Sequence, residues 1–95
     1  MTYELEFKKS ALKEWKKLGA TVQSQFKKKL KSILNDPHIA SAKISGGNEL
    51  YKIKLRQAGY RLVYEVNDSV VTVTVISVGK RDKGKVYKVA MERMN

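Results

Sequence analysis

The sequence has no cysteine, a single proline and a single histidine among its 95 residues. Without cysteine no disulfide can hold a small secreted fold together, and with one imidazole a zinc site built from Cys and His ligands is not expected. No apolar run reaches the ~20 residues of a membrane-spanning helix, and the N-terminal segment MTYELEFKK alternates like a strand instead of resembling a signal peptide. These absences predict a cytoplasmic protein that uses no metal and no cofactor and does not contact a membrane.

Acidic residues are also scarce, since nine Asp and Glu stand against 20 Lys and Arg and leave a net charge of +11. This balance favours a polyanionic partner, nucleic acid before an anionic membrane surface, although a generic basic protein remains an alternative. We expect a single domain over residues 1–95. A chain of this size buries only somewhat over ~60% of the surface of its unfolded form, so any site should be an open groove.

Hydrophobic periodicity divides the chain into strands and helices. Alternating patterns predict strands at about 3–7, 50–56, 60–67 and 70–78, and helical spacing predicts helices at about 8–18, 21–35 and near the C-terminus. Gly19 is expected just after the end of the first helix, and Asp36-Pro37 should end the second. The order β-α-α-β-β-β-α predicts an α+β fold: a mainly antiparallel four-stranded sheet, an N-terminal helical hairpin packed on it and a short C-terminal helix.

The stretch YKIKLRQAGYRLVYEV, residues 51–66, crowds cations onto one face of two neighbouring strands. Because side chains alternate along a strand, Lys52, Lys54 and Arg56 share a face, and Arg61 joins them if the connecting loop has an even number of residues. Two cations ~7 Å apart repel by on the order of 2 kcal/mol at an effective dielectric of 20, and by less when they are solvated. Either the face is simply solvated, or an anion such as phosphate belongs there.

The expected register of these two strands places cations opposite one another. The predicted pairs are Arg56 with Arg61, Lys54 with Val63 and Lys52 with Glu65. Glu65 would then be the only acid that offsets the repulsion.

The usual sets of catalytic residues are missing: there is no Ser-His-Asp set, no His-Cys pair and no Gly-rich phosphate loop. His38 follows Asp36-Pro37 in a loop and is expected to be a surface histidine. The segment GKRDKG, residues 79–84, is basic and flanked by glycine but does not fit a phosphate-loop motif. An enzyme with this inventory must therefore work with Lys, Arg and Tyr.

Cleavage of RNA by its own 2′-hydroxyl fits these residue types, because the substrate supplies the nucleophile. Cations aimed at the phosphorane would stabilise its charge, and a Lys crowded by other cations has a lowered pKa and can act as a base. Arg is a poor acid because its pKa exceeds 12, so the cleavage of free RNA should be slow. Tyr87, near Arg81 in sequence, would either stack on a base or cap the core from the last helix.

At these residues the chain resembles the RelE family of bacterial toxins, within the wider RelE/ParE superfamily. The most specific stretches are SALKEWKKLG, residues 51–66 and VISVGKRDKGKVY, and the match covers essentially the whole chain. The resemblance implies a small four-stranded sheet with helices packed on it, and cleavage of mRNA in the ribosomal A site, which halts translation. It also implies a RelB-like antitoxin as partner, which would supply the DNA-binding part of a complex that binds its own operator.

The resemblance also assigns roles to individual residues. Lys52 and Lys54 match the family's paired strand lysines, which support proton abstraction from the 2′-hydroxyl and charge stabilisation; we favour Lys54 as the base. Arg61 matches the arginine held against the scissile phosphate. Arg81 matches the arginine proposed to protonate the leaving 5′-oxygen, and Tyr87 matches the tyrosine that stacks on the cleaved nucleotide.

Further cations are candidates for contact with the phosphates of small-subunit ribosomal RNA, which would be salt-dependent and blind to sequence. They are Lys13, Lys16, Lys17, Lys27, Lys28 and Lys31. Arg56 matches no catalytic role of the family and is assigned at most to backbone or ribosomal RNA contact. Two other functions remain open at this point: a ParE-like inhibitor of DNA gyrase without nuclease activity, and a plain basic RNA-binding module.

Overall fold

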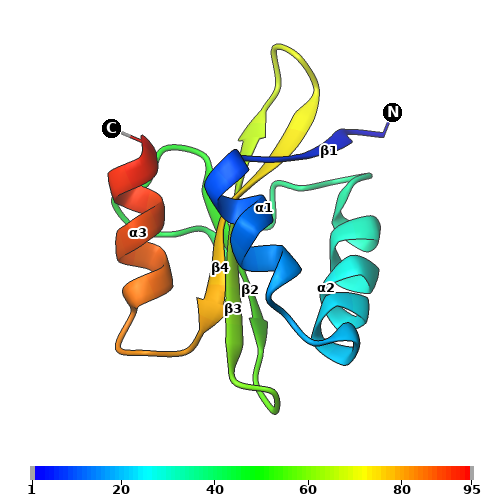
Figure 1. Cartoon of the computed structure of the whole chain (residues 1–95). Helices are drawn as coiled ribbons and strands as arrows, with labels where there is room; N and C mark the ends of the chain where they lie inside the picture. Colours follow the sequence, from blue (N-terminus) through cyan, green and yellow to red (C-terminus); the bar gives the residue numbers. More distant parts are fainter. Residues whose placement is uncertain (1, 95) are drawn as a thin grey trace.

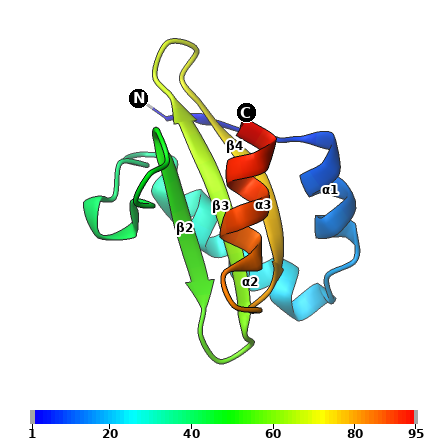
Figure 2. The same ribbon diagram turned by 90° about the vertical axis from the view of Figure 1, so that its left-hand side faces the viewer.

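In the computed structural model, which describes residues 2–94, a twisted sheet lies between helices on both of its faces (Figures 1 and 2). The elements are β1 Glu4–Phe7, α1 Lys9–Lys16, α2 Ala20–Ile33, a short 3₁₀ helix at Ala40–Ala42, β2 Leu50–Leu55, β3 Tyr60–Asn67, β4 Thr72–Lys80 and α3 Lys85–Met94. The predicted order β-α-α-β-β-β-α is confirmed, and only the 3₁₀ helix was not expected. Met1 and Asn95, the ends of the expected domain, lie outside the described residues.

The strands follow the spatial order β1-β4-β3-β2, so the longest strand, β4, lies inside the sheet. The pairs β2–β3 and β3–β4 are antiparallel and β1–β4 is parallel, which confirms a mainly antiparallel four-stranded sheet. Helices cover both faces of β4, and Val73, Val75 and Ile76 are completely buried. The nearly continuous apolar run of this strand follows from that double coverage.

Alternation along the strands divides the core between the two faces. Leu62 and Tyr64 of β3 pack with the buried faces of α1 and α2, whereas Val63 packs with Val86 and Ala90 of α3 on the other face. Burial of each such side chain contributes roughly 1.5–3 kcal/mol, so both helical layers are held mainly by packing.

The N-terminal part differs from expectation in two places. Gly19 has φ −65° and ψ 156° and is the N-cap of α2, because α1 already closes with the Lys17 and Leu18 N–H groups donating to Glu14 and Trp15. β1 is an edge strand and its expected core face is only partly covered: Leu5 is 38% exposed.

The β2–β3 hairpin has the predicted faces but a different register. The observed pairs are Leu55–Tyr60, Lys54–Arg61, Lys52–Val63 and Leu50–Glu65. Gly59, at φ +74°, ends a four-residue turn and donates its N–H to the Leu55 oxygen at 2.8 Å. A residue without Cβ adopts this conformation most easily, so the hairpin closes one residue earlier than predicted and Arg56 leaves the strand. The loop is still even in length, which is why the faces are correct.

Candidate active site

The corrected register concentrates positive charge at Lys54, which pairs directly with Arg61 on the face that carries α3. Glu65 pairs with Leu50 instead of Lys52 and lies beside Met91 and Met94 in another hollow. Within residues 2–94, Lys52, Lys54 and Arg61 form no ion pair. The positive charges of this face are therefore balanced by fewer nearby acids than the sequence predicted.

This crowding acts on the protonation of Lys54. The charge of Lys52 lowers the pKa of the Lys54 ammonium, and burial and the charges of Arg61 and Arg56 lower it further. A lysine with a lowered pKa is neutral more often near neutral pH, and only the neutral amine accepts a proton. The neighbouring charges therefore favour Lys54 as a base.

The loop after β4 brings Arg81 to the same place. The Arg81 N–H donates to the Gly59 oxygen at 2.7 Å, which ties this loop to the β2–β3 turn. Lys83 and Gly84 both have positive φ, +46° and +76°, and they redirect the chain into α3. The Lys85 N–H donates to the Asp82 oxygen at 2.8 Å and completes the turn.

Tyr87 lies in the first turn of α3 with its ring partly buried against the core on that face. The Lys52 Nζ is 5.9 Å from the ring centroid, a cation–π distance. The Tyr87 hydroxyl is buried and has no hydrogen-bond partner within residues 2–94. Tyr87 therefore covers part of the core, as one of the two sequence interpretations predicted. It also borders the cationic face, where the other interpretation has it stack on a base.

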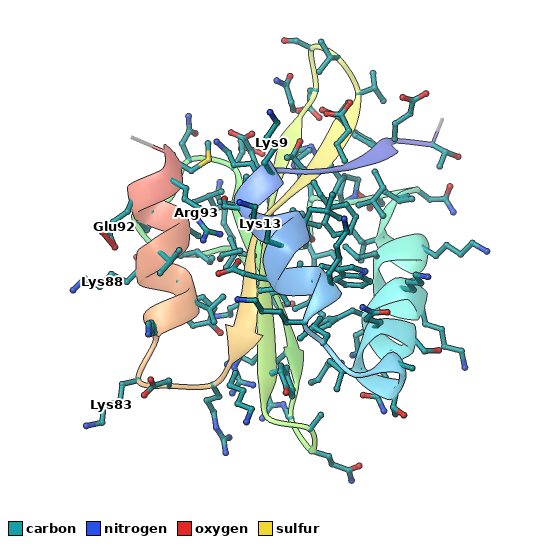
Figure 3. All side chains as sticks on the ribbon, viewed as in Figure 1. Lys9, Lys13, Lys83, Lys88, Glu92 and Arg93 are labelled. Atoms are coloured by element: carbon teal, nitrogen blue, oxygen red, sulfur yellow. The ribbon has the colours of Figure 1, made fainter. Side chains whose placement is uncertain are left out.

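These groups surround an open pocket of about 470 Å³ at the end of the sheet. It is lined by Lys54, Arg61, Arg81, Asp82, Lys83, Gly84, Lys85, Val86 and Tyr87. Four of the five predicted catalytic residues line this one pocket, and Lys52 adjoins it through the ring of Tyr87. Figure 3 shows Lys83 extending outward from the loop between β4 and α3.

Sequence reasoning missed Asp82, Lys83 and Lys85 as parts of the site. The available signal for Asp82 and Lys83 is the basic segment at residues 79–84, which fits no phosphate-loop motif. Among residues 2–94, Asp82 is the only acid that lines the pocket, so these residues place no cluster of carboxylates there.

His38 is exposed, as expected, but it is held in a network of side chains from distant segments. Its Nε2 is 2.9 Å from Asp68 Oδ1, and its Nδ1 is 3.0 Å from the Tyr51 hydroxyl and 3.1 Å from Glu49 Oε2. The Tyr3 hydroxyl donates to the same Asp68 oxygen at 2.6 Å. The hydrogen bond with Asp68 raises the pKa of His38, against an opposing effect of burial. Both ring nitrogens of His38 thus contact neighbouring side chains, and we call this surface cluster of His38, Asp68, Glu49, Tyr51 and Tyr3 the His38 clamp.

The candidate ribosomal RNA contacts are spread over two helices and a turn. Lys13 and Lys16 lie on α1, Lys17 caps it, Lys27, Lys28 and Lys31 lie on α2, and Arg56 lies in the β2–β3 turn; all are exposed. Lys28 and Arg56 line one groove, and the others lie outside it.

Comparison with known proteins agrees with the fold. A family model described as the ParE toxin of type II toxin-antitoxin systems, parDE, matches residues 5–84. The mRNA interferase toxin RelE of Escherichia coli K12 is 54% identical over 94 residues, 99% of either chain. A double arginine-to-alanine mutant of E. coli toxin RelE in the free state has a TM-score of 0.92 at 53% identity over all of both chains. A chain of the intact E. coli RelBE toxin-antitoxin complex has a TM-score of 0.82 at 56% identity, covering 85% of this chain and 99% of that chain.

These matches define the class: the chain belongs to the RelE/ParE family of toxins of type II toxin-antitoxin systems. Its identity to RelE over the full length shows further that it belongs to the RelE branch of that family. The resemblance inferred from sequence is thereby confirmed. Over residues 2–94, none of the helices is both long enough and apolar enough to cross a bilayer.

Proposed function

We propose that this chain is the toxin of a type II toxin-antitoxin system and an endoribonuclease that cleaves mRNA in the ribosomal A site. One observation carries the proposal: Lys54, Arg61, Arg81 and Tyr87 line one open pocket, and none of its cations is paired with an acid within residues 2–94. The E. coli relative with 54% identity is an mRNA interferase toxin, and the same activity follows here.

The chemistry needs only the substrate and the side chains that line or adjoin the pocket. The Lys54 amine takes the proton of the 2′-hydroxyl, and the freed oxygen attacks the scissile phosphorus. Lys52 and Arg61 stabilise the extra negative charge of the phosphorane. The bond from phosphorus to the 5′-oxygen then breaks, and that oxygen takes a proton from Arg81, which leaves a 2′,3′-cyclic phosphate and a 5′-hydroxyl. Tyr87 stacks on the nucleotide and keeps the attack in line.

The same inventory accounts for dependence on the ribosome. The pocket contains no histidine or glutamate, and arginine is a weak acid. Alignment of the mRNA must therefore come from its setting in the A site, where lysines of the N-terminal helices contact ribosomal RNA phosphates. These are Lys13, Lys16, Lys17, Lys27, Lys28 and Lys31. The natural inhibitor is a RelB-like antitoxin, as in the E. coli RelBE complex. With it, the toxin takes part in binding operator DNA through the antitoxin, and the whole cycle takes place in the cytoplasm.

The test is cleavage of mRNA on programmed ribosomes by the purified protein. We expect a cut within the A-site codon. Replacing Arg61 or Arg81 by Ala should lower the rate by about 10²–10³-fold, the usual effect of removing one group that stabilises the transition state. Lys88→Ala is the matched control, because Lys88 is exposed on α3 and does not line the pocket.

Three outcomes would contradict the proposal. Intact mRNA in the A site excludes the nuclease. A block of DNA supercoiling while translation continues would indicate a gyrase inhibitor of the ParE type. A loss of only a few-fold in RNA binding for both arginine variants, without any cleavage by the parent, would indicate a plain RNA-binding module.

A further inference from the structure

A second open groove adjoins the active pocket, and Lys54 lines both. This groove, of about 460 Å³, lies between α2 and the end of β2. Its lining is Gln25, Lys28, Lys29, Lys54, Leu55, Arg56, Gln57 and Ala58. A smaller hollow of about 230 Å³ continues along β2 and shares Lys29 and Lys54 with the groove. Lys54 therefore stands where the pocket and the groove meet.

One wall of the groove is a polar ridge on α2. Lys28 and Lys29 follow Gln25 by three and four residues, which places all three on one side of the helix. The neighbouring stripe of the same helix, Phe26 and Leu30, is buried against the sheet. Because that stripe fixes the helix, Lys28 and Lys29 are held in the groove beside the end of β2. β2 is an edge strand of the sheet (Figure 2).

The other wall is the β2–β3 turn. Arg56 and Gln57 are exposed there, and their position is set by the hydrogen bond from the Gly59 N–H to Leu55. Leu55 itself is 6% exposed and forms an apolar floor. The lining contains four cations and no acid, and none of these cations forms an ion pair within residues 2–94. Such a surface is complementary to a chain of phosphates.

We propose that this groove binds the sugar-phosphate backbone of the mRNA beside the scissile phosphate, with Lys29 and Arg56 contacting phosphates from opposite walls. The proposal rests on the proposed function, since it extends the path of the same RNA strand. Proteins that hold single strands combine aromatic side chains that stack on bases with a cationic groove that follows the backbone. Tyr87 of the adjoining pocket supplies the ring here, and this groove supplies the cations for phosphate contacts. These contacts carry no sequence information, so the groove adds affinity without selecting a codon. Arg56 matches no catalytic role of the family, and the proposal gives it a role in binding the substrate.

The test is binding of short RNA without ribosomes. Fluorescence anisotropy is measured with a trinucleotide that fills only the pocket and with RNAs of about nine nucleotides extended on the 5′ or the 3′ side. All carry a 2′-deoxy sugar at the cleavage position, so they cannot be cut. The variant is Lys29→Gln with Arg56→Gln, and the control of equal charge is Lys9→Gln with Lys88→Gln. Lys9 and Lys88 are exposed on α1 and α3 and line neither hollow (Figure 3).

The expected effect follows from counterion release. For single strands each phosphate contact adds about 0.7 to the slope of log affinity against log salt, which is a factor of about five at about 0.1 M salt. The groove variant should bind one of the extended RNAs about 25-fold more weakly, with a slope shallower by about 1.4. It should bind the trinucleotide like the parent, and the control should match the parent on the extended RNAs.

The other outcomes overturn the proposal. Equal losses in variant and control would show that net charge alone is responsible. No loss with either extended RNA would show that the strand does not enter the groove, and if ribosomal cleavage then still falls, ribosomal RNA occupies it instead. Failure of the proposed function looks different: the parent would bind the extended RNA through the groove and yet leave mRNA on ribosomes intact.

Discussion

An ion pair between Glu14 of α1 and Arg93 of α3 covers the part of the β4 edge that β1 does not pair with. β1 pairs only with Thr72–Val75, so beyond that point side chains take the place of a strand. Arg93 donates two hydrogen bonds to the Glu14 carboxylate, at 2.9 and 3.1 Å, and one to the Ile76 oxygen at 2.7 Å. Glu14 in turn accepts the Val78 N–H at 3.2 Å. The pair thus links both helical layers to the sheet.

We predict that the double-mutant cycle of Glu14→Ala and Arg93→Ala gives a coupling free energy of about 1–2 kcal/mol. Hydrogen bonds to charged groups contribute about 1.5–3 kcal/mol when buried. The side chains of Arg93 and Glu14 are 22% and 33% exposed, so solvent screening reduces the free energy of their interaction. Arg93→Ala alone should cost about 2 kcal/mol, since it also leaves the Ile76 oxygen without its donor.

Urea denaturation of the four proteins measures the cycle, with a common m-value as the check for two-state unfolding. Lys88→Ala, on the exposed face of α3, is the control and should change stability by less than about 0.5 kcal/mol. A coupling free energy below about 0.5 kcal/mol would refute the reasoning, because it would not exceed the ordinary non-additivity of independent sites. Since α3 also carries Tyr87, Arg93→Ala should lower ribosomal cleavage more than Lys88→Ala does.

Three further predictions concern protonation and backbone conformation. Lys52→Ala removes the main cause of the lowered pKa of Lys54, so the rise of the cleavage rate with pH should move to higher pH; an unchanged profile would exclude Lys54 as the base. The pKa of His38 is raised in the folded state, so its clamp with Asp68 stabilises fully below the unfolded value of about 6.5 and loses this effect as pH rises through the folded pKa. His38→Gln should therefore destabilise more at about pH 5.5 than at about pH 8.5, as measured by urea denaturation, and an equal loss at both would contradict the charged clamp. Gly59→Ala should cost about 1–2 kcal/mol because Gly59 has φ +74° with open space around it, and a neutral effect in thermal unfolding would show that the turn relaxes freely.

The faces of the sheet were predictable from the sequence, but the register was not. Which side chains share a face depends only on alternation and on an even loop, and both can be read from residues 51–66. Which residues pair depends on where the turn closes, and that is decided by the left-handed conformation of Gly59 and its bond to Leu55. The sequence contains the glycine, but several turns of equal length would satisfy the alternation.

The site was predictable to a similar extent. That Lys52, Lys54 and Arg61 share a face follows from strand alternation. Tyr87 was a stacking candidate from its residue type and its place near Arg81, and the roles of Arg81 and Tyr87 came from the resemblance. Their arrival at the pocket depends on the bond from the Arg81 N–H to the β2–β3 turn and on the two positive φ angles before α3. The network around His38 could not have been predicted, because it joins side chains 30 residues apart that no local pattern connects.

The corrected register strengthens the case that an anion belongs on the cationic face. With Glu65 opposite Lys52, part of the repulsion would have been balanced within the fold. In the structure Glu65 pairs with Leu50, and Lys54 faces Arg61 with Lys52 as a further neighbour. This arrangement does not stabilise the fold, because like charges opposite one another destabilise a sheet. A phosphate bound between these side chains would remove the repulsion, and in the proposed groove that begins at Lys54 further phosphates would do the same for Lys28, Lys29 and Arg56.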